Sequence, residues 1–215
     1  MTFLSTTTDL VEYQYNVNVN SDSTRSGLLP KQARSVLSRQ LLLEAARGVI
    51  EDVGIDGLTL AMVASRAGVA VGTVYNRFED RTHLIEEVIE EWTHDVSARF
   101  SSSMTETTLR DPRERLRALV GLFCENHPFI RQILINSPLI PGIGEIVNPW
   151  LEQEKSRLVF DLSRVSANDR EHTDLVATMI LSTVERAAIN EVDDARWSRL
   201  VTELPSAGAA LLALR

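Results

Sequence analysis

Residues 58–78 read LTLAMVASRAGVAVGTVYNRF. Thr59 is suited to cap a short helix that runs to about Ala67, because a threonine hydroxyl accepts a hydrogen bond from the backbone of the first helical turn. Gly68 then supplies a turn, and a second short helix is expected over about 71–78. Two short helices joined by a glycine turn predict a helix-turn-helix.

The two short helices carry side chains suited to packing against each other. Ala64 is small at the expected crossing point, and the apolar residues around it are Met62, Val63, Val69 and Val74. This packing leaves the outer face of the second helix exposed, and in a helix-turn-helix that face enters the major groove of DNA. The stretch therefore predicts recognition of duplex DNA.

Helical periodicity continues on both sides of this stretch. Apolar residues between positions 37 and 53 recur at intervals of three and four, which is the pattern of one helix face, and Gly54 and Gly57 are expected to end that helix. The acidic pair Glu79 and Asp80 opens a long helix that should reach about Phe100.

Further helix starts follow along the chain. They are marked by capping residues and prolines at Asp111-Pro112, Pro128, Asn148-Pro149, Asn168 with Glu171, and Asp193 or Asp194. The helices are expected to end near positions 136, 164 and 191, and Pro205 should break or kink the last one. The sequence thus predicts an all-α protein of about nine helices without a convincing strand.

The charge is unevenly distributed along the chain. The formal net charge is −8, yet residues 31–84 carry seven basic and six acidic side chains, whereas residues 85–215 carry a net −7. Because a duplex repels an acidic surface, the part that meets DNA should be the locally basic one.

Composition also bears on location. No run of 18 apolar residues is present, so we expect no membrane-spanning helix and no membrane partner. The N-terminus has no basic start followed by an apolar stretch, which argues against a secretory signal. Cys124 is the single cysteine, so no internal disulfide is possible. These features favour a cytoplasmic protein.

Residues 39–84 resemble the DNA-binding domain of the TetR family of bacterial repressors. The matching residues stand at the family's spacing: Arg39, Ala45, Ala46, Gly54, Gly57, Thr59, Ala67, Gly68, Val69, Gly72, Thr73, Val74, Tyr75, Phe78 and Leu84. The resemblance implies a DNA-binding domain at 35–84 and a helical effector-binding and dimerisation domain at 85–215. Residues 1–34 have few large apolar side chains and are expected to form a disordered tail, with a short strand near 13–19 as the alternative.

The resemblance also implies which residues meet DNA. The expected set is Arg39, Thr59, Val71, Gly72, Thr73, Tyr75, Asn76, Arg77 and Arg81. Hydroxyl, amide and guanidinium groups donate hydrogen bonds to phosphate oxygens, and Asn and Arg can read base edges. The sequence departs from the family at Ala70, where a serine cap is usual, and at Ala61, Asn76 and Arg77.

The C-terminal part offers an apolar set for a ligand cavity, although much of it must be ordinary core. The candidate cavity residues are Leu119, Phe123, Phe129, Ile133, Ile143, Val147 and Trp150. Apolar stripes on the last two helices predict a homodimer held by a four-helix bundle, with packing inside one chain as the alternative. The candidate interface residues are Met179, Ile180, Val184, Ala187, Trp197, Leu200, Val201 and Leu204.

Other features have two interpretations each. Tyr75 is expected to contact DNA and Phe78 to lie in the core. The acidic residues Glu86, Glu87, Glu90 and Glu91 form either a metal site or, as we expect, a solvated helix face. Cys124 is either a thiol sensor or a buried, inert side chain, which is the more common case. No cofactor and no metal are expected.

The sequence favours a dimeric repressor that binds a palindromic operator and is released by a small apolar or amphipathic ligand. Such a ligand acts only through its different affinity for two states of the protein. The alternatives are a DNA-binding protein without a ligand and an enzyme on a helical scaffold. No nucleophile elbow, phosphate loop or zinc motif is present, which counts against the enzyme.

Overall fold

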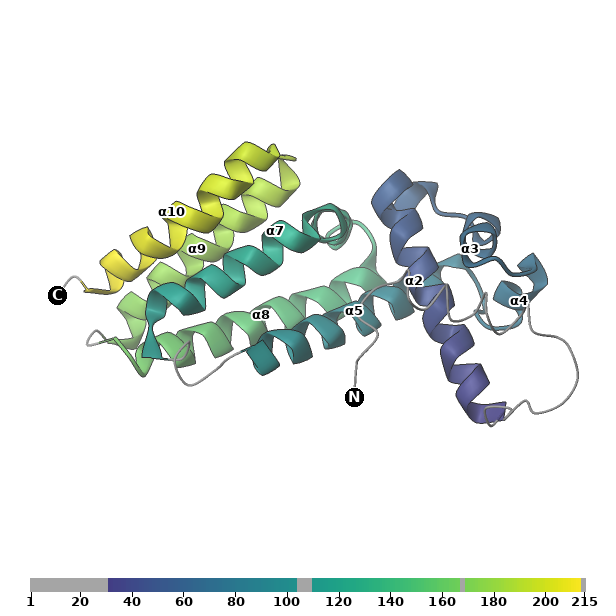
Figure 1. Cartoon of the computed structure of the whole chain (residues 1–215), viewed down its shortest axis with the longest axis horizontal. Helices are drawn as coiled ribbons and strands as arrows, with labels where there is room; N and C mark the ends of the chain where they lie inside the picture. Colours follow the sequence, from purple (N-terminus) through teal and green to yellow (C-terminus); the bar gives the residue numbers. More distant parts are fainter. Residues whose placement is uncertain (1–30, 104–109, 167–168, 214–215) are drawn as a thin grey trace, which may run out of the picture. The chain divides into compact units, whose positions relative to one another are not determined.

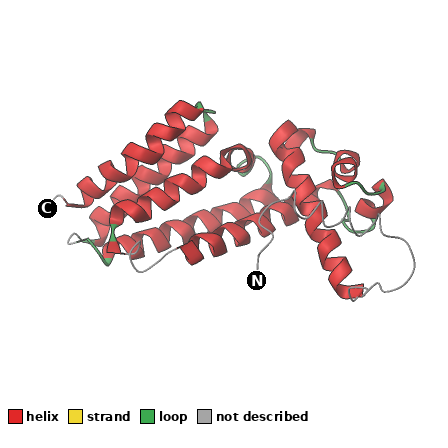
Figure 2. Ribbon diagram, in the orientation of Figure 1, coloured by secondary structure: helices red, strands yellow, loops and turns green. Residues whose placement is uncertain are grey.

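In the computed structural model, the chain divides into two units, residues 1–37 and 38–215. The structure describes residues 31–103, 110–166 and 169–213 (Figure 1). Within these ranges all regular secondary structure is helical, as predicted (Figure 2). The tail expected at 1–34 lies outside the described residues as far as position 30, but residues 31–34 belong to a helix instead.

Eight helices are described, where about nine are expected. In chain order they are α2 (Lys31–Gly57), α3 (Leu60–Ala67), α4 (Val71–Tyr75), α5 (Arg81–Ser103), α7 (Pro112–Asn136), α8 (Pro141–Ser163), α9 (Arg170–Ile189) and α10 (Asp194–Ala213). The domain boundary expected at 84–85 falls inside α5, so one helix serves both the helix-turn-helix and the C-terminal part.

Local capping signals place several of these helix ends correctly. Gly54 has φ +79°, a conformation that disfavours other residues, and it interrupts the helical backbone of α2 where a stop is expected. The Asp111 carboxylate accepts a hydrogen bond from the Arg113 N–H at 2.9 Å and caps α7. Asp193, one of the two expected residues, caps α10, and α9 is capped by Asp169, the residue after the expected Asn168.

Two helix starts predicted from proline are wrong, because Pro128 lies inside α7 and Pro149 inside α8. Pro205 does not break the last helix, and α10 continues through it to Ala213. A proline inside a helix removes one backbone hydrogen bond. In α7, burial of Phe129, Ile130 and Ile133, which follow Pro128 in the sequence, offsets that loss.

The C-terminal helices share one apolar core. In Figure 1, α7 packs against α9 and α10, while α8 lies along α5 and α9. Inside, the Trp92 ring stands edge-on to Phe129 and to Trp150, with centroids 5.3 and 5.4 Å apart. No helix among the described residues has the length and apolar character that crossing a membrane requires.

A buried ion pair joins three helices beside this core. Arg115 on α7 lies 2.6 Å from the Asp161 carboxylate on α8, and its guanidinium stacks 4.1 Å from the Phe100 ring centroid on α5. Burial lowers the pKa of Arg115, although Asp161 acts in the opposite direction. A buried charge must keep its partner, so this contact fixes the three helices in register.

Candidate nucleic-acid interface

The turn between α3 and α4 has the geometry that the sequence predicts. The Thr59 hydroxyl accepts a hydrogen bond from the Met62 N–H at 3.2 Å and caps α3. Gly68 has φ +66° and ends α3, and the Val69 N–H donates to the Ala64 carbonyl at 3.0 Å. The chain thereby reverses within a few residues and delivers α4 at a fixed angle to α3.

Buried side chains hold α4 in place. Val63, Val74 and Phe78 are fully buried, and Ala64 is nearly so, which confirms Phe78 as a core residue. Helix α4 ends at Tyr75, earlier than expected, and residues 76–78 form a turn closed by hydrogen bonds to the carbonyls of residues 72 and 74. Ala70 gives α4 no side-chain cap, so the helix depends on packing.

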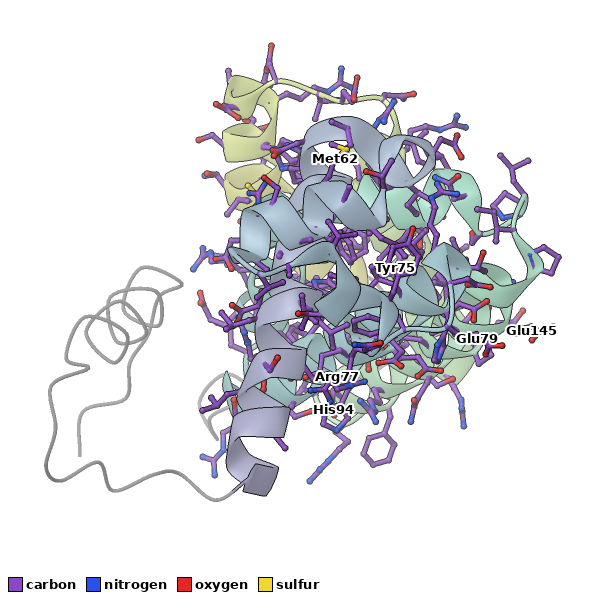
Figure 3. All side chains as sticks on the ribbon, turned by 90° about the vertical axis from the view of Figure 1, so that its right-hand side faces the viewer. Met62, Tyr75, Arg77, Glu79, His94 and Glu145 are labelled. Atoms are coloured by element: carbon purple, nitrogen blue, oxygen red, sulfur yellow. The ribbon has the colours of Figure 1, made fainter. Side chains whose placement is uncertain are left out.

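The outer face of the helix-turn-helix brings together several of the predicted DNA-contacting residues. Tyr75 is 61% exposed and Val71 42% exposed, while Thr59, Thr73 and Asn76 are also exposed. A Cβ added at Gly72 would meet nothing within 4 Å, so the backbone there is open to close approach. Figure 3 shows Tyr75 and Met62 on this face; Met62 is 37% exposed rather than packed between the helices.

Two predicted DNA-contacting arginines point to partners inside the chain. The Arg39 guanidinium lies 2.6 Å from Glu87 and 3.2 Å from Glu91. Arg81 donates from Nε to the Leu58 carbonyl at 2.8 Å and from Nη2 to the Ile55 carbonyl. Arg39 thus fastens α2 to α5, and Arg81 fastens the start of α5 to the turn before α3.

Other arginines near the helix-turn-helix are also paired. Arg66 forms an ion pair with Asp52, and Arg47 forms one with Glu51 at 2.9 Å. Arg77 is half-exposed beside the recognition face and has interactions of its own. The donors offered by this face are therefore mainly hydroxyl and amide groups, which suit phosphate oxygens and base edges alike.

The predicted ligand cavity is smaller than expected and has a different wall. A cavity of about 30 Å³ is lined by Leu119, Phe123 and Trp150 from the predicted set. The other four predicted residues pack as solid core instead: Phe129, Ile133, Ile143 and Val147. The cavity also contacts Glu154 and Glu185, which apolar periodicity does not reveal.

The residues of the predicted interface differ in exposure. Four of them are buried within the chain: Ile180, Val184, Ala187 and Trp197. Met179 is 49% exposed, and Leu200, Val201 and Leu204 are half-buried. Leu175 and Ile189, which lie on the same helix as Met179, are exposed apolar residues.

The acidic cluster and the lone cysteine have ordinary surroundings. Glu87 and Glu91 bind Arg39, and the described residues contain no group of three His, Cys, Asp or Glu side chains placed to hold a metal ion. Cys124 is half-buried, and burial raises the pKa of its thiol, which lowers the thiolate fraction. A raised pKa makes a thiol less reactive.

Comparisons with known proteins match the N-terminal part most closely. The sequence profile described as bacterial regulatory proteins, tetR family, matches residues 42–88. The HTH-type transcriptional regulator BetI of Pectobacterium carotovorum is 33% identical over 92 residues, which make up 43% of this chain and 47% of the relative. The chain thus matches about half the length of the curated relatives found.

Solved structures match over a larger share of the chain. A transcriptional regulator from Rhodococcus superposes with a TM-score of 0.67 at 19% identity, covering 81% of this chain and 94% of the other. A putative regulator from Saccharomonospora viridis, solved in complex with choline, gives a TM-score of 0.67 at 18% identity, covering 79% and 94%. These likenesses show a common fold.

The profile match covers the same residues whose caps, turn and exposed face form the helix-turn-helix described above. Residues 42–88 are thus similar to the DNA-binding part of the bacterial regulatory proteins of the tetR family.

Proposed function

We propose that the chain is a transcription regulator that binds operator DNA through the exposed face of α4. One observation carries the proposal: Thr73 and Tyr75 are exposed on α4 and Asn76 at its C-terminal end, while the buried Val74 and Phe78 anchor the opposite side. Such a helix offers a rigid reading surface to the major groove. Thr59, Val71, Gly72 and Arg77 complete the proposed contact set, from which we omit Arg39 and Arg81 because both bind partners within the chain.

A homodimer fits this proposal. In a single chain, helix α9 leaves the apolar side chains of Leu175, Met179 and Ile189 exposed to solvent, which is unfavourable. Pairing α9 and α10 with the same helices of a second copy gives a two-fold contact. Two recognition helices related by a two-fold axis read a palindrome whose half-sites lie about one helical turn apart.

We further propose that a small apolar or amphipathic effector weakens operator binding. The cavity at Leu119, Phe123 and Trp150 is the candidate position for it. A cavity of 30 Å³ holds about one or two water molecules, so an effector must enlarge it. The effector therefore binds the state with the enlarged cavity more tightly than the state with the small one. Any effect on operator binding depends on such a difference in affinity. The relatives named as regulators support this role over an enzyme.

Selection of genomic fragments by the purified protein tests the proposal. Recovered sequences should share a near-palindrome, and a footprint on it should cover two half-sites. Enrichment of asymmetric sequences, or of none, would contradict it. A protein that binds its site equally well across a broad panel of small apolar compounds would instead be a constitutive DNA-binding regulator.

A further inference from the structure

A second and larger hollow lies between the helix-turn-helix domain and the C-terminal helices. This cleft has a volume of about 530 Å³ and is bounded by α2, α5 and α7. From α2 it receives Gln40, Glu44 and Arg47, so a molecule within it contacts the DNA-binding domain directly. It shares Val96, Phe100 and Leu122 with the 30 Å³ cavity.

The cleft has an apolar wall on α5 and a glycine on α7 that leaves space open. Trp92, Val96 and Phe100 contribute from α5, and Gly121 lies opposite on α7. Glycine in the middle of a helix costs about 1 kcal/mol relative to alanine. A Cβ at Gly121 would meet nothing within 4 Å, so packing does not require glycine there. What the missing side chain provides is space in the cleft.

An indole N–H beside this wall has no acceptor. Trp92 is 4% exposed, and its Nε1 has no hydrogen-bond partner among the described residues. Leaving a buried donor unpaired costs about 1–3 kcal/mol. A ligand that reaches Trp92 with a π face or an oxygen would reduce that cost.

Some charged side chains at the rim of the cleft have hydrogen-bond or ion-pair partners and others do not. Arg47 donates to Glu51 and Asn126, and Arg117 lies beside Glu114, so these guanidinium groups are already bonded. Glu44 has no hydrogen bond or ion pair with a described residue. Partial desolvation raises the pKa of the Glu44 carboxyl more than the nearby Arg47 lowers it. The cleft is also lined by Arg99 and Asp95, whose side chains lie 4.0 Å apart, by Glu91, which pairs with Arg39, and by Glu125. Four acidic side chains thus face three arginines, so the lining carries a small excess of negative charge.

We infer that the cleft binds a small aromatic ammonium ion, with its cation beside Glu44 and its aromatic ring against Trp92 and Phe100. Aromatic faces and a carboxylate together suit an organic cation, because the ring face attracts positive charge and the carboxylate neutralises it. The bound ion contacts α2 and α5 at once. Its occupancy consequently sets how the DNA-binding domain is held against the C-terminal helices.

Isothermal titration calorimetry on the full-length protein tests the inference with three probes of matched shape. These are 2-phenylethylammonium, the neutral 2-phenylethanol and the anionic 3-phenylpropanoate. The ammonium ion should bind at least about tenfold more tightly than either of the others, a difference of about 1.4 kcal/mol. Equal binding of the alcohol, preference for the anion, or no binding of the ammonium ion at millimolar concentration would overturn the inference.

Variants locate the site. Glu44→Gln should remove most of the preference for the cation, and Gly121→Leu should weaken binding of all three probes because its side chain occupies part of the cleft. Gly121→Leu also raises helix propensity, so it should not lower the melting temperature; Gly121→Ala provides a smaller step. Glu152→Gln, an exposed residue on α8, is the matched control and should bind as the wild type does. Cation binding by Gly121→Leu as tight as that of the wild type would overturn the assignment.

A regulatory effect of this site rests on the proposed function and is measured separately. With a selected operator, 2-phenylethylammonium should change the affinity of the wild type for DNA more than that of Gly121→Leu. Calorimetric binding with no change in operator affinity would overturn the regulatory effect alone. Failure to bind any operator would count against the proposed function and leave the calorimetric result standing.

Discussion

The Arg39 guanidinium on α2 lies 2.6 Å from the Glu87 carboxylate on α5. These two residues stand 48 positions apart, and their contact joins the first helix of the helix-turn-helix domain to the helix that continues into the C-terminal part. A displacement of α5 would therefore pull on α2. We therefore propose a structural role for Arg39 in place of a contact with DNA.

A double-mutant cycle of Arg39→Met and Glu87→Gln distinguishes the two roles. Both side chains are partly exposed, so their coupling free energy in urea denaturation should be at most about 1 kcal/mol. The two single variants should change operator affinity by similar small factors, because each breaks the same ion pair. A large loss of affinity confined to Arg39→Met would show that Arg39 contacts the DNA.

Adjacent residues on α9 separate dimer formation from folding. Met179 is 49% exposed and Ile180 only 2% exposed. Met179→Asp should leave a folded chain that sediments as a monomer or a weak dimer. Ile180→Asp should lower the free energy of unfolding by several kcal/mol, because it buries an unpaired charge. If Met179→Asp remains a tight dimer in analytical ultracentrifugation, the interface lies on another face.

Glu185 makes stability depend on pH. Burial raises the pKa of its carboxyl above the ordinary value of 4.5, and ionisation is therefore less favourable in the folded chain than in the unfolded one. Protonated Glu185 therefore contributes fully to the free energy of unfolding below pH 4.5. This contribution is lost as the pH rises through the pKa that Glu185 has in the folded state. Glu185→Gln should accordingly raise the melting temperature at pH 7 and change it little well below pH 4.5. An equal gain at both pH values would contradict this cause.

Predictions from the sequence succeeded where the signal is local. Thr59 and Gly68 define their turn through hydrogen bonds to residues within a few positions, so the residue types alone indicate the geometry. Pro128 gave a local signal too, but burial of Phe129 on the same helix outweighs it. Tertiary packing of this kind leaves no mark on a single stretch of sequence.

Of the candidate functional residues, only those on the exposed face of the helix-turn-helix could be predicted from the sequence. The exposure of Tyr75 follows from its place opposite Val74 in the helix-turn-helix pattern. An apolar stripe, in contrast, does not tell core from partner surface, and Ile180 proved to be core. The pairing of Arg39 with Glu87 and the cleft beside Gly121 depend on how distant helices pack, which periodicity does not encode.

The most direct measurement is the affinity of the Tyr75→Ala variant for a selected operator at fixed salt. Phe160→Ala is the matched control, because Phe160 on α8 is 62% exposed and Tyr75 is 61% exposed. Tyr75→Ala should lose about 1–3 kcal/mol of specific binding while keeping its melting temperature, and Phe160→Ala should bind as the wild type does. Unchanged operator binding by Tyr75→Ala, or an equal loss in Phe160→Ala, would contradict recognition of DNA by the exposed face of α4.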